Sequence, residues 1–447
     1  MIKKYVTYCL LLVSSTFVFA QETMNFSLAE AIDYALENNR IVKNAQRDIE
    51  AAKEQKWETT ATGLPQIDAN VDYQNFLKQQ ISLIPAEFVG GEPGEFAEVI
   101  FGTKQNVNAA ITLRQLLFDG SYLVGLQSAK VFLEISKNAK EKTDLEVRKA
   151  VINAYGNMLL AQETVDILEK NTVVLQKNLN DIQKIFENGL EEEESVEQLQ
   201  ITLAGVESAL NNASRLKIIA KNLFNLTIGL DINTDTRLTE NLEDLAVNNV
   251  SLELIDANED INNNIDYKIA FNDKTSKDLM LKLEKSRGLP SLSGFINGGY
   301  LGFSDSFTFL DSDQQWAGFS LVGVSLNVPI FSSLGRSAAT QRARINVEKA
   351  KEDLIQIEQE LKLEIASAKS NYQFSIEDFD IKKRNLKLAE RIERKNEIKF
   401  FEGIASSFDL RQAQTQLYGA QQDYLQSMLE VITRKADLET ILNITNN

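Results

Sequence analysis

The stretch Leu64-Pro65-Gln66-Ile67-Asp68-Ala69-Asn70-Val71-Asp72-Tyr73-Gln74 decides how this chain is built. After the proline, polar and apolar side chains alternate residue by residue. Successive side chains of a β-strand point to opposite faces, so the alternation predicts a strand over residues 64–77. A strand of about ten residues with one apolar and one polar face is typical of a transmembrane β-barrel with a wet interior.

Three further stretches alternate in the same way, over residues 106–117, 289–303 and 316–330. On the face that we expect to line the lumen of the barrel, the four strands carry Asp68, Asn70, Asp72, Asn108, Arg114, Ser293, Asn297 and Asn327. An amphipathic sheet packed on a soluble core is the alternative. Four strands cannot close a barrel, and open edges in lipid leave backbone groups unpaired. A barrel of this kind therefore requires several copies of the chain.

The chain also repeats itself. Leu64-Pro65 returns as Leu289-Pro290, and Gly189-Leu190 returns 214 residues later as Gly403-Ile404. At the same offset, the heptad stripe Val196, Leu199, Leu203, Val206 and Leu210 returns as Leu410, Ala413, Leu417, Ala420 and Tyr424. Agreement position by position favours an internal duplication, and the period of 3.5 residues indicates coiled-coil packing.

Outside the strand windows the sequence is almost free of helix breakers and follows helical periodicity. Ser27 and Glu30 have the spacing of a capping box, and the helix that they begin is expected to reach Gly63. Further helices are expected over 121–188, about 100 Å long, and over 195–228, 334–401 and 409–445. We divide the chain into a leader (1–20), a first repeat (21–228), a linker (229–262) and a second repeat (263–447).

Composition excludes several classes of function. Acidic residues outnumber basic ones by 64 to 47, which argues against a nucleic-acid partner. The chain has no histidine, so histidine bases, Ser-His-Asp triads and histidine-ligated metals are excluded. We expect no cofactor, no metal site and no enzymatic activity.

The first 20 residues have the pattern of a secretory signal peptide. Lys3 and Lys4 precede an apolar stretch, and Val18-Phe19-Ala20 suits a cleavage site with small residues. An N-terminal membrane anchor is the alternative, although the apolar stretch is short for a membrane span. Cys9, the only cysteine, lies in this segment.

These features together resemble the TolC-like outer-membrane efflux proteins. The resemblance rests on several weak motifs in a specific order: Ser27-Leu28-Ala29-Glu30-Ala31-Ile32, Gly63-Leu64-Pro65, Gln115-Leu116-Leu117-Phe118-Asp119-Gly120, Arg287-Gly288-Leu289-Pro290, Asn327-Val328-Pro329-Ile330-Phe331 and Phe408-Asp409-Leu410. It covers nearly the whole chain after the leader.

The resemblance implies a mainly α fold with a transmembrane β section. Three chains would form an α/β barrel channel, each giving four strands and long coiled-coil helices, with the linker in an equatorial belt. The channel would be the passive exit duct of a tripartite efflux pump or a type I secretion system. It would lie in the outer membrane of a Gram-negative bacterium and reach into the periplasm. Its implied partners are a periplasmic adaptor and an inner-membrane transporter of the RND, ABC or MFS type.

The resemblance also assigns residues. The two hairpin tips, Asn188-Gly189-Leu190 and Glu402-Gly403-Ile404, match the segment of the family that contacts the adaptor. Alternatively, each glycine merely ends a helix in the left-handed conformation. Asp409 and Gln412 match the periplasmic entrance constriction, where Asp409 would form an acidic ring. Alternatively, Asp409 is the N-cap of the helix that begins at Leu410.

Two other functions compete with a channel. A periplasm-spanning coiled-coil protein with a β-strand membrane anchor would have no pore, but it leaves the polar face of the strands unexplained. An enzyme would need a nucleophile or a pair of acids that the sequence does not offer. The acidic balance predicts a pore that prefers cations. The sequence leaves the exported substrate open.

Overall fold

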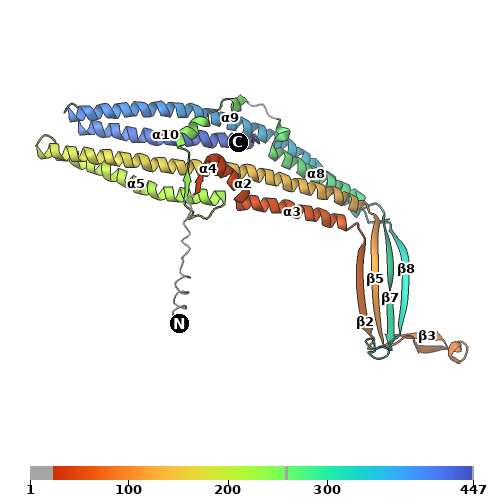
Figure 1. Cartoon of the computed structure of the whole chain (residues 1–447). Coiled ribbons are helices and arrows are strands. Elements are labelled where there is room, and N and C mark those ends of the chain that lie inside the picture. The colour runs from red at the N-terminus through yellow and green to blue at the C-terminus, as the bar shows by residue number, and fades with distance from the viewer. Residues whose placement is uncertain (1–23, 257–259, 445–447) are drawn as a thin grey trace, which may run out of the picture. The chain divides into compact units, whose positions relative to one another are not determined.

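The computed structural model describes residues 24–256 and 260–444 (Figure 1). The predicted leader lies outside the described residues. The chain forms two compact units: unit 1 comprises the segment up to Ile49, Ser136–Ala270 and the segment from Leu354, and unit 2 comprises Glu50–Ile135 and Phe271–Asp353. The units cut across the two sequence repeats, because each repeat gives strands to unit 2 and a helical hairpin to unit 1.

Unit 2 contains an antiparallel sheet of four strands in the order β2-β5-β7-β8 (Figure 1). The strands are β2 (Gln66–Asn75), β5 (Gln105–Phe118), β7 (Ser291–Ser304) and β8 (Trp316–Asn327). The last strand ends before residue 330, where the sequence had placed its end. Pro329 has no N–H for the ladder and cannot continue a paired strand.

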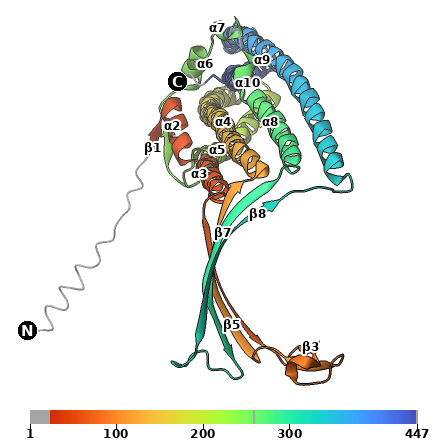
Figure 2. The same cartoon turned by 90° about the vertical axis from the view of Figure 1, so that its right-hand side faces the viewer.

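A smaller two-stranded sheet, which the sequence did not predict, lies between β2 and β5. Strand β3 (Ile81–Pro85) pairs with β4 (Phe96–Ile100), and the 3-10 turn η1 (Ala86–Val89) follows β3. Figure 2 shows this hairpin beyond the end of the four-stranded sheet. Gly90 and Gly94 in its loop have φ angles of 86° and 90°, which favour glycine.

The helices account for most of the remaining chain. They are α2 (Leu28–Asn38), α3 (Arg40–Ala61), α4 (Gly120–Glu187), α5 (Glu193–Ile228), α8 (Ile265–Ser286), α9 (Gly335–Phe401) and α10 (Ser407–Ile441). In the described part of the chain, no helix combines the length and the hydrophobicity of a membrane span.

The expected single helix from Ser27 to Gly63 is wrong, because the chain turns at Asn39. The backbone of Asn39 leaves the helical region (φ −60°, ψ 134°), which ends α2. Its Nδ2 donates to the carbonyl of Thr227, and its Oδ1 accepts from the N–H of Ile41, both at 2.7 Å. Asn39 thus caps α3. An asparagine side chain is favourable at the N-cap of a helix and unfavourable in a helix interior, where it competes for backbone hydrogen bonds.

The linker between the repeats has elements of its own. Strand β6 (Thr236–Leu238) pairs in parallel with β1 (Met24–Phe26), and the short elements α6 (Leu242–Asn248), α7 (Glu253–Asp256) and η2 (Ile261–Asn263) follow. The linker is therefore tied to the start of the chain.

Two hydrophobic clusters hold unit 1 together. In the larger one Tyr155 is fully buried and donates to the carbonyl of Phe26 at 3.1 Å. The smaller cluster joins both helical hairpins and contains Leu175, Ile182, Val196, Leu199, Leu203, Phe400 and Leu410. Four of these belong to the predicted heptad stripes, so the stripes face the coiled-coil core.

Candidate functional site

The register of the four-stranded sheet places the eight predicted lumen residues on one face. Asp68 lies opposite Thr112, which lies opposite Asn297, and Asp72 lies opposite Asn108. Ser293 pairs with Ser325, and Asn327 is two residues further along β8 on the same face. The opposite face carries large apolar side chains that are exposed in the single chain: Ile67, Val71, Ile111, Val322, Val324 and Leu326. All four strands of the sheet therefore share one face with the predicted polar residues and an opposite face that is apolar.

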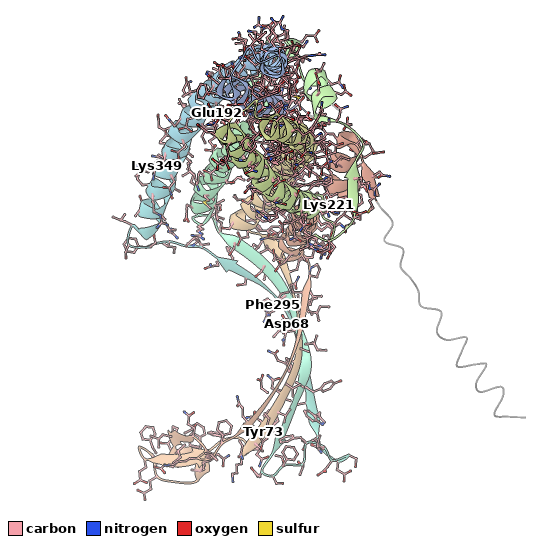
Figure 3. All side chains as sticks on the ribbon, turned by 90° about the vertical axis from the view of Figure 1, so that its left-hand side faces the viewer. Asp68, Tyr73, Glu192, Lys221, Phe295 and Lys349 are labelled. Carbon is pink, nitrogen blue, oxygen red and sulfur yellow. The ribbon has the colours of Figure 1, made fainter. Side chains whose placement is uncertain are left out.

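The polar face is not uniform, and the sequence analysis missed this. The strands of the second repeat add Phe295, Leu301, Phe303, Phe319 and Leu321 to the same face. The ring of Phe295 lies over Gly323, where an added Cβ would come within 2.5 Å of the ring. Figure 3 labels Asp68 and Phe295 in the middle of the sheet. The β2–β5 half of this face is thus rich in carboxylates and amides, whereas the β7–β8 half mixes large apolar side chains with Ser293, Asn297 and Asn327.

Arg114 is the one basic residue among the eight, and it is paired. Its guanidinium donates to Asp68 Oδ2 at 2.9 Å, across the neighbouring strands β5 and β2. Both side chains are more than half exposed, so the pair contributes little to stability. Its consequence is electrostatic, because it neutralises the charge of Asp68. Asp72, the second aspartate on β2, is not part of the pair.

Aromatic side chains gather at the end of the sheet far from its helices. Tyr73 contacts the rings of Phe307 and Phe309 edge-on, with centroids 5.8 and 6.0 Å apart, and Phe309 also contacts Trp316. Tyrosine and tryptophan at the end of an apolar sheet face are typical of a membrane–water interface.

The two hairpin tips have the same backbone geometry. Gly189 and Gly403 have φ angles of 73° and 71°. The N–H of the residue after each glycine bonds back to the helix, Leu190 to Ile185 at 3.1 Å and Ile404 to Lys399 at 2.8 Å. This is the Schellman arrangement, so each glycine does end its helix in the left-handed conformation.

The residue after each glycine is unusually exposed. In a Schellman motif this position frequently makes a hydrophobic contact with the last helical turn. Leu190 and Ile404 are instead 78% and 75% exposed. Asn188 and Glu402, which precede the glycines, are exposed as well. Both tips thus present an apolar side chain to their surroundings.

Asp409 does not occupy the N-cap position of α10, as one reading of the sequence had it. Ser406 is the N-cap, and Asp409 is the third residue of the helix in a capping box. Hydrogen bonds from the hydroxyl and the N–H of Ser406 lower the pKa of Asp409. Asp409 and Gln412 are both exposed, one turn apart. A serine three residues before an aspartate was the signal in the sequence.

The four glutamates after the first tip are largely accounted for by local structure. Glu192 is the N-cap residue of α5, and Glu193 and Glu194 lie in its first turn, where acidic residues are favourable. Glu191 accepts from the hydroxyl of Ser195 at 2.6 Å. Ser195 Oγ also lies 2.9 Å from Ser407 Oγ, which joins the two hairpins near their tips.

Comparison with known proteins agrees with this geometry. The profile of the outer membrane efflux protein family matches residues 31–229 and 281–443, well over half of the chain. The chain belongs to the outer membrane efflux protein family. Curated protein sequences give no match.

Solved structures of outer-membrane efflux proteins share the fold of this chain. The outer membrane protein VceC of Vibrio cholerae has a TM-score of 0.71 at 15% identity, with 93% of this chain and 96% of that chain covered. The CmeC outer membrane channel of Campylobacter jejuni has a TM-score of 0.71 at 17% identity, with coverages of 94% and 87%. The MtrE outer membrane channel of Neisseria gonorrhoeae has a TM-score of 0.69 at 17% identity, with coverages of 93% and 88%.

Membership in the family confirms the fold class and the resemblance found in the sequence. This outer membrane efflux protein is a channel of the Gram-negative outer membrane that extends into the periplasm. The alternative, a periplasm-spanning coiled-coil protein with a β-strand anchor and no transport role, is not favoured. The family and the structural neighbours are channels rather than enzymes. In residues 24–256 and 260–444, no three acidic or cysteine side chains form a group that could hold a metal ion.

Proposed function

We propose that three copies of this chain form the passive exit duct of a tripartite efflux pump or a type I secretion system. The two-faced sheet with edge strands β2 and β8 carries this proposal. In lipid, the outer edges of both strands need partners, and a neighbouring copy supplies β8 for β2. The apolar face then meets lipid, and the polar face lines water.

The polar face would give the pore its selectivity. Asp68, Asn70, Asp72 and Asn108 form a polar stripe on one side of Arg114, and Ser293, Asn297 and Asn327 continue it. The half that carries Phe295 and Leu321 is less polar. In a trimer, three polar and three less polar sectors would alternate around the pore, which suits a duct that passes cargo without binding it tightly.

The hairpin tips would meet a periplasmic adaptor. Exposed Leu190 and Ile404 support this role, because the Schellman motif frequently packs this apolar side chain on its own helix, whereas here both side chains remain open to a partner. Asn188, Gly189, Glu402 and Gly403 would provide the backbone and polar rim of the same contact. The adaptor would link the duct to an inner-membrane transporter of the RND, ABC or MFS type.

Asp409 would form an acidic ring at the periplasmic entrance, with Gln412 one turn away. Its lowered pKa keeps it charged at neutral pH, and three copies around one axis attract cations. The duct performs no reaction of its own in this proposal, because the transporter supplies the energy.

Electrical recording from the purified protein in a planar lipid bilayer tests the proposal. We expect single-channel currents and a reversal potential that shows cation preference in a salt gradient. If detergent-purified material is trimeric by mass but forms no channels, the duct is contradicted and the coiled-coil protein without a pore is favoured. Monomeric material in detergent and in membranes would contradict the trimer.

A further inference from the structure

The polar face of the four-stranded sheet carries a continuous apolar strip on its β7–β8 half. At five successive positions of this face, one side chain of the β7–β8 pair is large and apolar. From the helical end of the sheet to its far end, the members of the apolar strip are Phe295, Leu321, Phe319, Leu301 and Phe303. Phe295 and Phe303 are eight residues apart on β7, which corresponds to about 26 Å at about 3.3 Å per residue. The apolar strip is therefore as long as the membrane-embedded band of a barrel, about 25 Å.

Small residues opposite the large ones keep the apolar strip low and continuous. Three of its members lie opposite a glycine or an alanine: Phe295 opposite Gly323, Phe319 opposite Gly299, and Leu301 opposite Ala317. The ring of Phe295 lies over Gly323, since a Cβ added there would come within 2.5 Å of the ring. Leu321 and Phe303 are 49% and 51% exposed, and the other three members are partly exposed. The apolar strip thus offers an accessible surface and not a packed core.

A polar track runs beside the apolar strip over the same length. On this face β5 and β2 carry Arg114, Thr112, Asn108, Asn106, Asp68, Asn70 and Asp72. Asp68 is paired with Arg114, whereas Asp72 forms no ion pair with any residue that the structure describes. In the proposed trimer, β2 of the next copy lies beside β8, so that carboxylates flank the apolar strip on both sides. The charge next to the apolar strip therefore favours a cation.

The length of the apolar strip selects the shape of the ligand. An apolar chain that lies on apolar side chains removes surface from water, and its free energy falls with every methylene covered. A compact molecule would cover one or two of the five positions, whereas an extended chain covers all of them. A charged or polar head cannot lie on leucine and phenylalanine without losing its hydration, but it can stay on the polar track.

We infer that the apolar strip binds an elongated amphiphile with a cationic head on its way through the duct. Its apolar chain lies along Phe295, Leu321 and Phe319, and its head lies toward Asp72. This inference rests on the proposed duct and names the chemical class that its wall retains. The binding is weak and reversible, because the chain is covered on one side only and water meets its other side.

Block of single-channel currents by an alkyl series tests the inference. Hexyl-, octyl- and decyltrimethylammonium are added below their micelle concentrations to the trimer in a planar lipid bilayer, and the concentration that halves the current is measured. We expect each added pair of methylenes to tighten the block about fourfold, which corresponds to half of the free energy of full burial.

Two kinds of variant separate the chain from the head. Phe319→Thr with Leu321→Thr removes apolar surface from the middle of the apolar strip, and the gain per pair of methylenes should fall below about twofold. Asp72→Asn should weaken the block by all three compounds about twofold to fivefold, the range of an exposed ion pair, without changing the dependence on chain length. Threonine suits a strand, so the sheet is retained.

Val322→Thr is the matched control. Val322 follows Leu321 on β8, but it belongs to the opposite, apolar face of the sheet and is 78% exposed in the single chain. This variant should be blocked like the unchanged protein.

Block that does not depend on chain length would overturn the inference, as would equal block by benzyltrimethylammonium and decyltrimethylammonium, which would indicate a site for compact rings. An effect of Val322→Thr as large as that of the variant on the apolar strip would also overturn it. In these three cases the channel conducts and the proposed duct stands. Trimeric material that forms no channels would overturn the duct itself.

Discussion

Ser406 and Asp409 cap the start of α10 reciprocally. The N–H and the hydroxyl of Ser406 donate to Asp409 Oδ2 at 3.0 and 2.7 Å, and the N–H of Asp409 donates to Ser406 Oγ at 3.2 Å. The carboxylate that is proposed to set the charge of the entrance is therefore also part of the helix end. These two roles can be separated, because the cap needs a hydrogen-bond acceptor and the ring needs a charge.

We expect Asp409→Asn to reduce the cation preference of the pore while α10 remains capped. The amide oxygen still accepts from Ser406, but three negative charges leave the entrance. The measurement is the reversal potential in a salt gradient across a planar bilayer.

Ser406→Ala is the matched control for this prediction. It should cost about 1 kcal/mol of stability, the usual value of a lost N-cap, and leave the sign and size of the ion preference nearly unchanged. An unchanged reversal potential in Asp409→Asn would remove Asp409 from the conducting path.

The pair between Arg114 and Asp68 predicts opposite effects of two substitutions in the sheet. Arg114→Gln frees the charge of Asp68 and should increase cation preference, whereas Asp68→Asn frees the charge of Arg114 and should decrease it. Stability should change by less than about 1 kcal/mol in both, because the pair is exposed. Shifts of the reversal potential in the same direction for both variants would show that these side chains do not face the pore.

The glycines of β7 predict where the sheet tolerates a side chain. A Cβ at Gly299 would come within 2.1 Å of the carbonyl oxygen of Ala109 on β5, whereas at the adjacent Gly298 the nearest atom is 3.5 Å away. We expect Gly299→Ala to lower the yield of trimer in the membrane several-fold, because the paired backbones must separate. Gly298→Ala should behave like the unchanged protein. Equal yields of the two variants, measured by native gel, would contradict the close pairing of β5 and β7.

The sequence predicted the large elements because each has a strong period. Ile67 to Tyr73 alternate strictly, and Val196 to Leu210 follow the heptad, so the strand and the coiled coil were evident without the structure. The common face of the eight polar residues also followed from alternation once the strands were paired.

The sequence could not predict features that depend on distant partners. The turn at Asn39 is held by the carbonyl of Thr227, which lies 188 residues away in the chain. Phe295 shares the alternation of Ser293 and Asn297, so its place on the polar face could be predicted, but its packing over Gly323 of the neighbouring strand could not. Neither contact has a signature in the local periodicity.

A cluster of three charged or polar side chains predicts how stability depends on pH. Glu243 of the linker lies 2.9 Å from both Lys383 Nζ on α9 and Tyr424 Oη on α10. The hydrogen bond from Lys383, followed by that from Tyr424, lowers the pKa of Glu243, and burial, followed by the hydrogen bond to Glu243, raises the pKa of Tyr424 to about 12.

A carboxylate with a lowered pKa stabilises the folded state above its ordinary pKa, and this stabilisation is lost as the pH falls through the folded value. A tyrosine with a raised pKa stabilises it below pH 10, and that part is lost as the pH rises through about 12. We therefore expect Glu243→Gln to lower the midpoint of thermal unfolding at pH 7, by a contribution of about 0.5–1 kcal/mol for this half-exposed pair, and to lower it less at pH 3. Circular dichroism at both pH values measures this, with Asp244→Asn next to it as a control for the loss of a charge. An equal loss at pH 3 and pH 7 would mean that packing, and not the charge of Glu243, ties the linker to α9 and α10.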